Sequence, residues 1–169
     1  MEILLAALGG FFLDLLLGDP AWMPHPVVGM GRCIVWLESC LRAIFSKTPR
    51  GERAAGTVLA AALPLGTLAL SLGLLRLCRR IHPALAFILE TLWCWQSLAV
   101  RDLASESENV RRALTRGTLE EARGAVGRIV GRDSAALSRQ GVVRAAVETV
   151  AENFCDGVAS PMAYMLLGG

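Results

Sequence analysis

The run from Ala54 to Leu75 contains no charged residue, and it constrains the fold more than any other feature of the chain. A helix needs about 20 apolar residues to cross the hydrocarbon of a bilayer, and this run is long enough. The composition agrees, because 54% of the residues are hydrophobic and only 19% are charged. That balance is more apolar than is usual for a soluble domain. A membrane-spanning helix is therefore the first prediction.

Other apolar stretches accompany this run and carry few charges. Asp14 is the charged residue of the stretch near the N-terminus, and Glu90 is that of the stretch before residue 101. Trp93 and Trp95 suit an interfacial aromatic belt. No strand-like alternation occurs, so the fold class is predicted to be all-α, a multi-pass helical membrane protein. Membrane helices are expected at about 3–17, 54–75 and 83–100, with the start of a further one at 158–169.

Two polar segments separate these stretches. Residues 18–53 are expected to form a loop that carries motifs, and residues 101–157 read as amphipathic helices. The first of these helices spans about 101–116. Thr118 and Glu121 make a capping box for a second, which is expected to stop near Gly131. A third is expected to run from about Val142 and to end at Asp156-Gly157.

The distribution of basic residues favours a cytoplasmic location for both polar segments. A helical hairpin of 54–75 and 83–100 puts residues 18–53 and 101–157 on the same side of the bilayer. That side holds most of the arginines, and the positive-inside bias assigns it to the cytoplasm of a cell (inner) membrane. The formal net charge is only +2 and is not gathered into a stripe, so no nucleic-acid partner is expected. The lipid bilayer is the expected partner.

Three polar residues in the N-terminal part are candidates for chemistry. Asp14 lies in an apolar helix, where a central carboxylate is costly and is usually functional. An interfacial position that reaches water is the alternative. Asp19 precedes Pro20 and is either functional or an ordinary turn residue. His25 lies between two prolines, which would fix an imidazole at low entropic cost.

A second cluster is Gly131-Arg132-Asp133-Ser134. Its local chemistry is that of a helix stop followed by an N-cap. The functional interpretation gives Arg132 a phosphate or carboxylate of the substrate to bind with its guanidinium. Both interpretations are compatible.

The third cluster is an acidic stripe on one predicted helix. Arg144, Glu148, Glu152 and Asp156 follow each other in steps of four, and Asn153 lies beside them. Carboxylate and amide oxygens are the ligands that Mg²⁺ takes when it is shared with phosphates. The predicted metal ligands are therefore Glu148, Glu152, Asn153 and Asp156. The alternative is a solvated helix face with an Arg144–Glu148 ion pair.

Taken in order, these motifs resemble the adenosylcobinamide-phosphate synthase family of the CobD/CbiB type, which are membrane proteins of cobalamin biosynthesis. The matching motifs are Leu13-Asp14, Gly18-Asp19-Pro20, Pro24-His25-Pro26-Val27, Arg101-Asp102-Leu103, Val130-Gly131-Arg132-Asp133, Glu148-Thr149-Val150-Ala151-Glu152-Asn153, Asp156-Gly157-Val158 and Pro161. They extend from Leu13 to Pro161, and the ordered set is more specific than any one of its members. The resemblance is to the N-terminal part of the family.

The resemblance implies an enzyme that joins adenosylcobyric acid, a corrinoid, to an aminopropanol phosphate through an amide, with ATP and Mg²⁺. On that hypothesis Arg101 and Arg132 bind phosphate, and Asp14 and Asp133 belong to the same substrate-contacting set. Glu148 and Glu152 are catalytic as well as metal-binding, and His25 or Asp19 takes the proton of the amine.

Three further expectations follow. Family members continue with more membrane helices, so the chain is expected to be either a fragment or an early-terminated reading frame. A non-catalytic scaffold that gathers other cobalamin-pathway enzymes is an alternative function. A small transporter that uses Asp14 and Glu90 is a second alternative.

Overall fold

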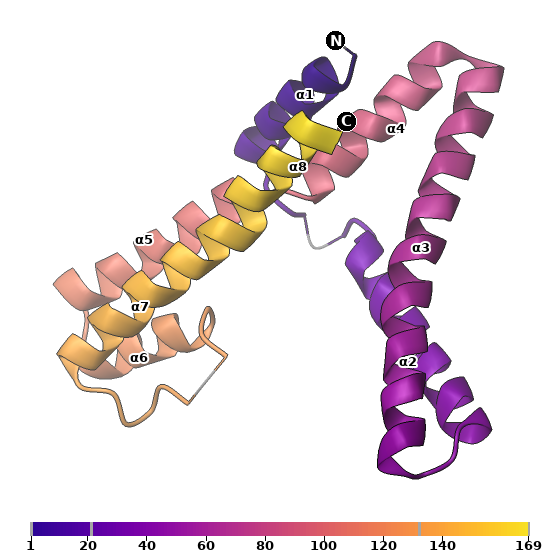
Figure 1. Ribbon diagram of the computed structural model, residues 1–169. Coiled ribbons are helices and arrows are strands. Elements are labelled where there is room, and N and C mark those ends of the chain that lie inside the picture. Colours follow the sequence, from indigo (N-terminus) through magenta and orange to yellow (C-terminus); the bar gives the residue numbers. More distant parts are fainter. Residues whose placement is uncertain (1, 21, 132, 169) are drawn as a thin grey trace. The chain divides into compact units, whose positions relative to one another are not determined.

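Every regular element is a helix in residues 2–20, 22–131 and 133–168, which are the residues that the computed structural model describes. The elements are α1 (Glu2–Leu17), α2 (Pro26–Ile44), α3 (Pro49–Ile81), α4 (Pro83–Gln96), α5 (Val100–Arg116), α6 (Leu119–Gly127), α7 (Arg139–Phe154), the π-helical turn η1 (Cys155–Ala159) and α8 (Ser160–Gly168) (Figure 1). The predicted all-α class is confirmed.

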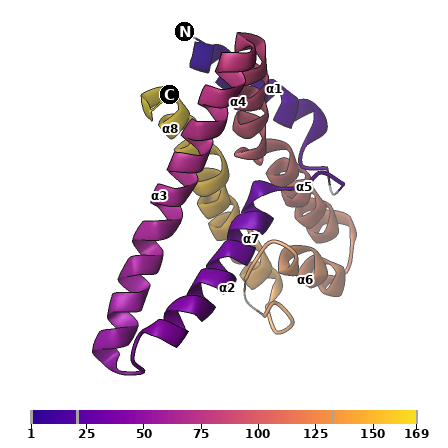
Figure 2. The ribbon, with the colours of Figure 1, turned by 90° about the vertical axis from the view of Figure 1, so that its right-hand side faces the viewer.

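The chain divides into two compact units. Unit 1 is Met1–Pro20 with Glu90–Gly169, and unit 2 is Ala21–Leu89. Unit 1 thus contains α1, the end of α4 and the elements from α5 onward. Unit 2 contains the helical pair α2 and α3 and the beginning of α4 (Figure 2).

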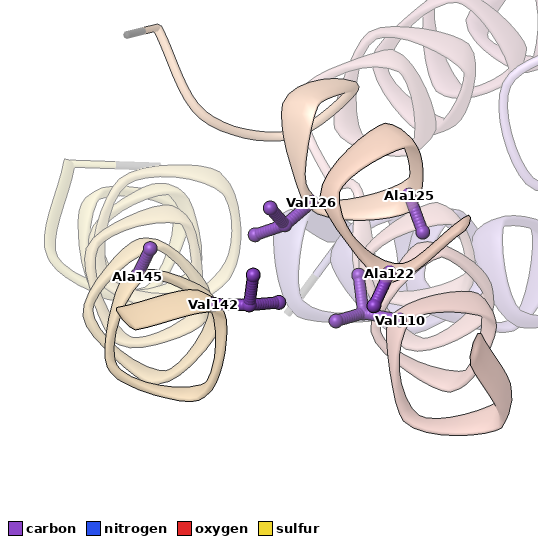
Figure 3. Close-up of a cluster of buried hydrophobic side chains, with 6 residues drawn as sticks. All are labelled: Val110, Ala122, Ala125, Val126, Val142 and Ala145. Atoms are coloured by element: carbon purple, nitrogen blue, oxygen red, sulfur yellow. The ribbon is translucent and has the colours of Figure 1, made fainter. Parts of the chain in front are cut away.

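The core of unit 1 lies where α5, α6 and α7 pack together. The buried residues of this cluster are valines and alanines: Val110, Ala122, Ala125, Val126, Val142 and Ala145 (Figure 3). Such small residues let the helix backbones approach closely. Partly buried leucine and isoleucine side chains pack against these residues. The predicted capping box of Thr118 and Glu121 begins α6. Arg123 Nε donates to the Leu137 carbonyl at 2.7 Å, which ties the connection before α7 to this core.

Glycine is required where α1 meets the end of α4. Ala6, Gly10 and Asp14 are the buried residues of α1, and their spacing of four puts them on one face. A Cβ atom at Gly10 would lie 2.6 Å from the Trp95 backbone nitrogen. The contact is therefore open only to glycine, and it brings Asp14 against the segment that follows α4.

Two helical stretches are long and apolar enough to cross a membrane. They are Pro49–Ile81, with a mean hydropathy of 2.1 in its best window, and Pro83–Arg116, with 1.3. None of the residues in the first window is buried within the described part of the chain. The shorter α1, with 16 residues, does not reach the usual spanning length.

The expectation of a loop at 18–53 is wrong, because α2 occupies most of that segment. His25 caps this helix and Pro26 occupies its first turn, a position where proline costs no hydrogen bond. Ile34, Leu37 and Leu41 are its least exposed large side chains and recur at helical spacing. Interspersed charges concealed this pattern in the sequence.

Three further expectations are corrected. The second amphipathic helix ends at Gly127 instead of Gly131. The next one does not end at Asp156-Gly157, because η1 continues it into α8 without a break. Trp95 is buried at 6% exposure instead of lying in an interfacial belt, since its ring packs within unit 1.

Candidate functional site

Asp14 caps a helix that begins far from it in the sequence. Its side chain is buried, and its Oδ2 accepts the backbone N–H of Val100 at 2.8 Å and that of Arg101 at 3.4 Å. Ala99, the residue at the N-cap position of α5, makes no side-chain capping bond. The carboxylate of Asp14 therefore performs for α5 what a local Asp or Ser usually does. Its negative charge is also well placed at the positive end of the helix dipole.

The second oxygen of the Asp14 carboxylate, Oδ1, does not take part in this cap. Asp14 Oδ1 is buried and has no hydrogen-bond partner among the residues that the structure describes. Buried polar atoms usually have a partner, so an unsatisfied one indicates either strain or a binding function. The cap and the unsatisfied oxygen together make Asp14 a structural anchor with one remaining acceptor.

The turn after α1 is held by two side chains from distant segments. Gly18 adopts a φ of +66°, the left-handed region that favours glycine. Its carbonyl accepts the indole N–H of Trp95 at 2.9 Å, and the N–H of Asp19 donates to Asp102 Oδ2 at 2.9 Å. The predicted base Asp19 thus has a fixed backbone and an exposed side chain.

Arg101 lies at the same place. Its guanidinium Nη1 donates to the Leu15 carbonyl at 3.4 Å, and its side chain is otherwise exposed. The exposed side chains of Arg101 and Asp19 therefore extend from two neighbouring segments. The Asp19 N–H donates to Asp102, and the Arg101 N–H donates to Asp14.

A third segment joins this place through η1. The Gly157 carbonyl accepts the N–H of Ala99 at 3.1 Å, just before α5 begins. A Cβ atom at Gly157 would lie 3.5 Å from the Cβ of Ala99, an ordinary van der Waals contact. We call the set Asp14, Gly18, Asp19, Ala99 to Asp102 and Gly157 the junction.

The acidic stripe of α7 is exposed and leads toward the junction. Arg144 Nε donates to Glu148 Oε1 at 2.7 Å, and this bond raises the pKa of the arginine. Glu152 and Asn153 are exposed and precede η1. Asp156, the last acid of the stripe, lies in the first turn of the π-helical η1.

A preassembled metal cage is absent from the described part of the chain, where no three His, Cys, Asp or Glu side chains gather in a metal-holding group. The predicted four-ligand set stays a prediction in that respect. Glu148 and Glu152 nevertheless fit the usual protein share of a magnesium site, in which one or two carboxylates act together with substrate phosphates and water.

His25 has a local structural role in unit 2. Its Nδ1 accepts the N–H of Val27 at 3.2 Å, and His82 Nδ1 accepts the N–H of Ala84 at 3.1 Å in the same way before Pro83. An imidazole whose Nδ1 accepts a hydrogen bond carries its proton on Nε2 when neutral. The Nδ1 lone pair of His25 is therefore engaged by the N–H of Val27, and a substrate could reach it only by displacing the cap of α2.

The Arg132 cluster is only partly described. Arg132 lies outside the described residues. Asp133 Oδ1 accepts the N–H of Ala135 at 2.9 Å, and the Ser134 hydroxyl donates to the Arg123 carbonyl at 3.0 Å. These bonds build a turn. The expected helix stop with an Asp133 or Ser134 N-cap is not what the described residues show, because α6 ends at Gly127 and Ser138 is the N-cap of α7.

A hollow in the described residues belongs to unit 2. It measures about 640 Å³ and lies between α2 and α3. Its charged lining residues are two bases, Arg42 and Lys47, and two acids, Glu38 and Glu52. It contains none of the predicted site residues.

The comparisons with known proteins identify the family. A family model described as CobD/Cbib protein matches residues 7–169. The chain belongs to this family. It is 46% identical over 158 residues to the "Cobalamin biosynthesis protein CobD" of Geobacter metallireducens, covering 93% of this chain and 48% of that protein. No solved structure matches the chain.

Two further relatives give the same result. The protein of the same name from Halalkalibacterium halodurans is 41% identical over 165 residues, covering 98% of this chain and 50% of that protein. The "Cobalamin biosynthesis protein CbiB" of Salmonella typhimurium is 36% identical over 157 residues, covering 93% and 49%. The chain therefore spans about half the length of the curated relatives that it matches.

Sequence reasoning named Asp14, Asp19 and Arg101 but missed the two side chains that hold the turn after α1. Asp102 was part of a motif without an assigned role, and Trp95 was assigned to an interfacial aromatic belt. The presence of Asp102 directly after Arg101 was the available signal. No local signal connects Trp95 with Gly18, because 77 positions separate them.

Proposed function

We propose that this chain supplies the motif-bearing part of a cobalamin-biosynthesis enzyme in the cell inner membrane. The reaction proposed is amide formation between adenosylcobyric acid and aminopropanol phosphate, driven by ATP and giving adenosylcobinamide phosphate. Family membership and the names of the relatives support the pathway. The junction supports the chemistry, because it holds an exposed acid and an exposed arginine on fixed backbones.

The acid substrate must be activated before it meets the amine. Its carboxylate oxygen attacks the γ-phosphorus of ATP, ADP leaves, and an acyl phosphate forms. The amine nitrogen then attacks the acyl carbon, the bond to phosphate breaks, and inorganic phosphate leaves. Mg²⁺, when bound, would neutralise charge on the transferring phosphoryl group.

The residues of the chain have separate tasks in this proposal. Glu148 and Glu152 would hold the metal from the exposed face of α7, with Asn153 and Asp156 as neighbouring oxygen donors. Arg101 would bind phosphate through its guanidinium. Asp19 would take the amine proton as the C–N bond forms. We favour Asp19 over His25 because the Nδ1 of His25 is already occupied by the cap of α2.

The cytoplasmic orientation of the junction belongs to the same proposal. ATP and the soluble substrates are found on that side, and the arginine-rich segments are expected there. The bilayer is the partner of α3, whose apolar surface is not covered by the rest of the chain.

The proposal is tested by reconstitution with the remaining half of a relative. Membranes would contain this chain together with the unmatched half of the Geobacter metallireducens protein, and the corrinoid product would be separated by chromatography. Product should form only with both ATP and Mg²⁺. Product formation without ATP would exclude the activated-acid mechanism.

A matched pair of variants tests the acidic stripe. Glu152→Gln should abolish turnover while membrane insertion is retained, whereas Glu120→Gln, at an exposed site on α6, should leave turnover unchanged. Full activity of Glu152→Gln would remove α7 from the mechanism.

A further inference from the structure

The peptide bond between Gly18 and Asp19 is held at both of its polar atoms. Its carbonyl accepts the Trp95 indole N–H at 2.9 Å, and its N–H donates to Asp102 Oδ2 at 2.9 Å. The two side chains come from segments 77 and 83 positions away. Tertiary structure, and not the local turn, therefore fixes the plane of this peptide.

The residues on either side remove the remaining freedom. Gly18 has a φ of +66°, and a Cβ atom there would lie 2.9 Å from Asp102 Oδ1. Pro20 follows directly and restricts the backbone of Asp19 to extended conformations. The backbone of Asp19 is thus restricted by Gly18 before it, by Pro20 after it and by the two hydrogen bonds to the Gly18–Asp19 peptide. The Asp19 residue itself stays exposed.

Fixing a backbone in this way costs conformational entropy and requires Gly18 in the left-handed region. Backbones held so firmly are typical of sites where geometry is part of the function. The Asp19 side chain is short, so a fixed backbone limits its carboxylate to the few positions that its staggered rotamers allow. Fixing that backbone before the substrate arrives removes an ordering cost from the transition state.

Asp102 itself is occupied with this task. Its Oδ2 accepts the Asp19 N–H, and its Oδ1 would lie 2.9 Å from a Cβ atom added at Gly18, so both oxygens are close to the turn. The buried ring of Trp95 supplies the second point of attachment.

We propose that Trp95 and Asp102 are positioning residues that aim the Asp19 carboxylate at the reacting amine. This inference rests on the proposed function for the role of Asp19. The clamp on the peptide is tested separately from that role.

The first test measures the clamp and needs no activity. Backbone amide hydrogen exchange of Asp19 would be followed in the wild-type chain in detergent micelles. Asp102→Ala should raise the exchange rate at least tenfold, and Asp102→Asn should stay near wild type because its amide oxygen can still accept the bond. Equal protection in all three proteins would overturn the clamp.

The second test measures positioning in the reconstituted enzyme described above. Asp102→Ala and Trp95→Phe should lower kcat at least tenfold with little change in KM, since substrate is still bound but the base is misaligned. Asp102→Asn should restore most of kcat. Trp93→Phe, the matched aromatic control on α4, should behave as wild type.

The outcomes separate the two proposals. A wild-type assembly without product contradicts the proposed function, while the exchange experiment still decides whether the clamp exists. Loss of exchange protection in Asp102→Ala with unchanged kcat would overturn the positioning role. A rise in KM at constant kcat would also overturn it, because it would assign Asp102 to substrate binding.

Discussion

The carboxylate of Asp14 and the backbone N–H of Val100 are joined at 2.8 Å across 86 positions of sequence, so that a residue of α1 begins α5. This bond explains why a charged residue is retained in an otherwise apolar helix. It also ties the first segment of unit 1 to the segment that bears Arg101 and Asp102.

Replacement of Asp14 should loosen the start of α5. Asp14→Ala removes the side-chain acceptor of the Val100 and Arg101 N–H groups, and loss of a helix cap costs about 1–2 kcal/mol of unfolding free energy. Asp14→Asn keeps one carbonyl oxygen and should cost less. Amide exchange at Val100 and Arg101, together with denaturant titration of helicity, measures both effects. Unchanged exchange in Asp14→Ala would show that the cap is dispensable.

Gly18→Ala should destabilise unit 1 for two reasons. An L-residue in the left-handed region costs about 1–2 kcal/mol, and the new Cβ would meet Asp102 Oδ1 at 2.9 Å. The control is Gly124→Ala in α6, where a Cβ meets nothing within 4 Å and alanine should stabilise the helix by about 0.5–1 kcal/mol. Thermal unfolding of the two variants should therefore shift in opposite directions. A shift in the same direction would contradict the geometry at Gly18.

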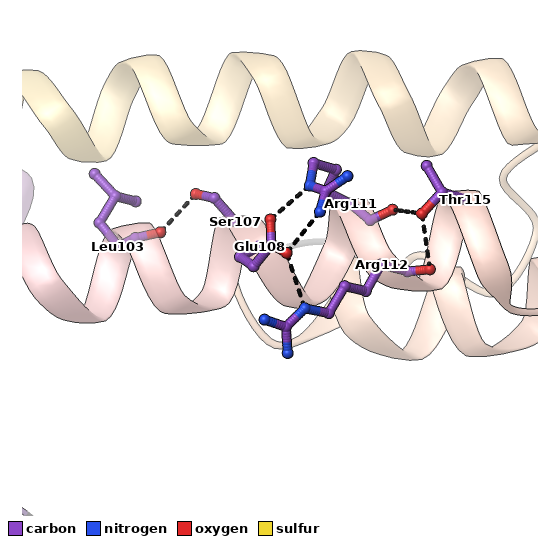
Figure 4. A network of polar contacts seen from close by, with 6 residues as sticks. All are labelled: Leu103, Ser107, Glu108, Arg111, Arg112 and Thr115. Atoms are coloured by element: carbon purple, nitrogen blue, oxygen red, sulfur yellow. Dashed lines mark hydrogen bonds and ion pairs between the residues drawn. The ribbon is translucent and has the colours of Figure 1, made fainter.

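Glu108 should titrate well below an ordinary glutamate. Hydrogen bonds from Arg111 and then Arg112 lower its pKa to about 2 (Figure 4). Because the pKa is lowered in the folded state, the contribution of this group is complete above its ordinary value of 4.5 and is lost as the pH falls toward 2. The exposed position makes that contribution small.

Carbon NMR of a chain with labelled glutamate carboxyl groups measures the midpoint directly. Arg111→Gln should raise it further than Arg112→Gln, since Arg111 contributes two of the three hydrogen bonds. A wild-type midpoint near 4.5 would show that the ion pairs do not persist.

The sequence predicted the parts of the fold that depend on local signals. The uncharged run at 54–75 predicted the helix α3, and the capping box of Thr118 and Glu121 predicted the start of α6. The helix α2 was missed because Arg32, Glu38 and Arg42 interrupt its apolar pattern. Asp156-Gly157 was read as a helix end because this pair usually is one, whereas a π-turn absorbs it here.

The candidate site was also predicted only as far as local sequence signals allow. Asp14, Asp19 and Arg101 could be named from residue chemistry, but their relationship could not. The bonds that unite them run from side chains to backbone groups more than 80 positions away, and no local pattern encodes such a partner. The roles of Trp95 and Gly157 are visible only in three dimensions.

The account depends on three separate segments meeting at the junction, and a disulfide tests this most directly. A Cβ at Gly157 would lie 3.5 Å from the Cβ of Ala99, within the range that a disulfide needs. Ala99→Cys with Gly157→Cys would be made in a chain whose exposed Cys33 and Cys155 are replaced by serine. Mild oxidation should protect both new thiols from a maleimide until a reductant is added, and Ala99→Cys with Gly124→Cys should remain labelled. If both thiols of the 99/157 pair stay reactive after oxidation, the junction does not exist as described.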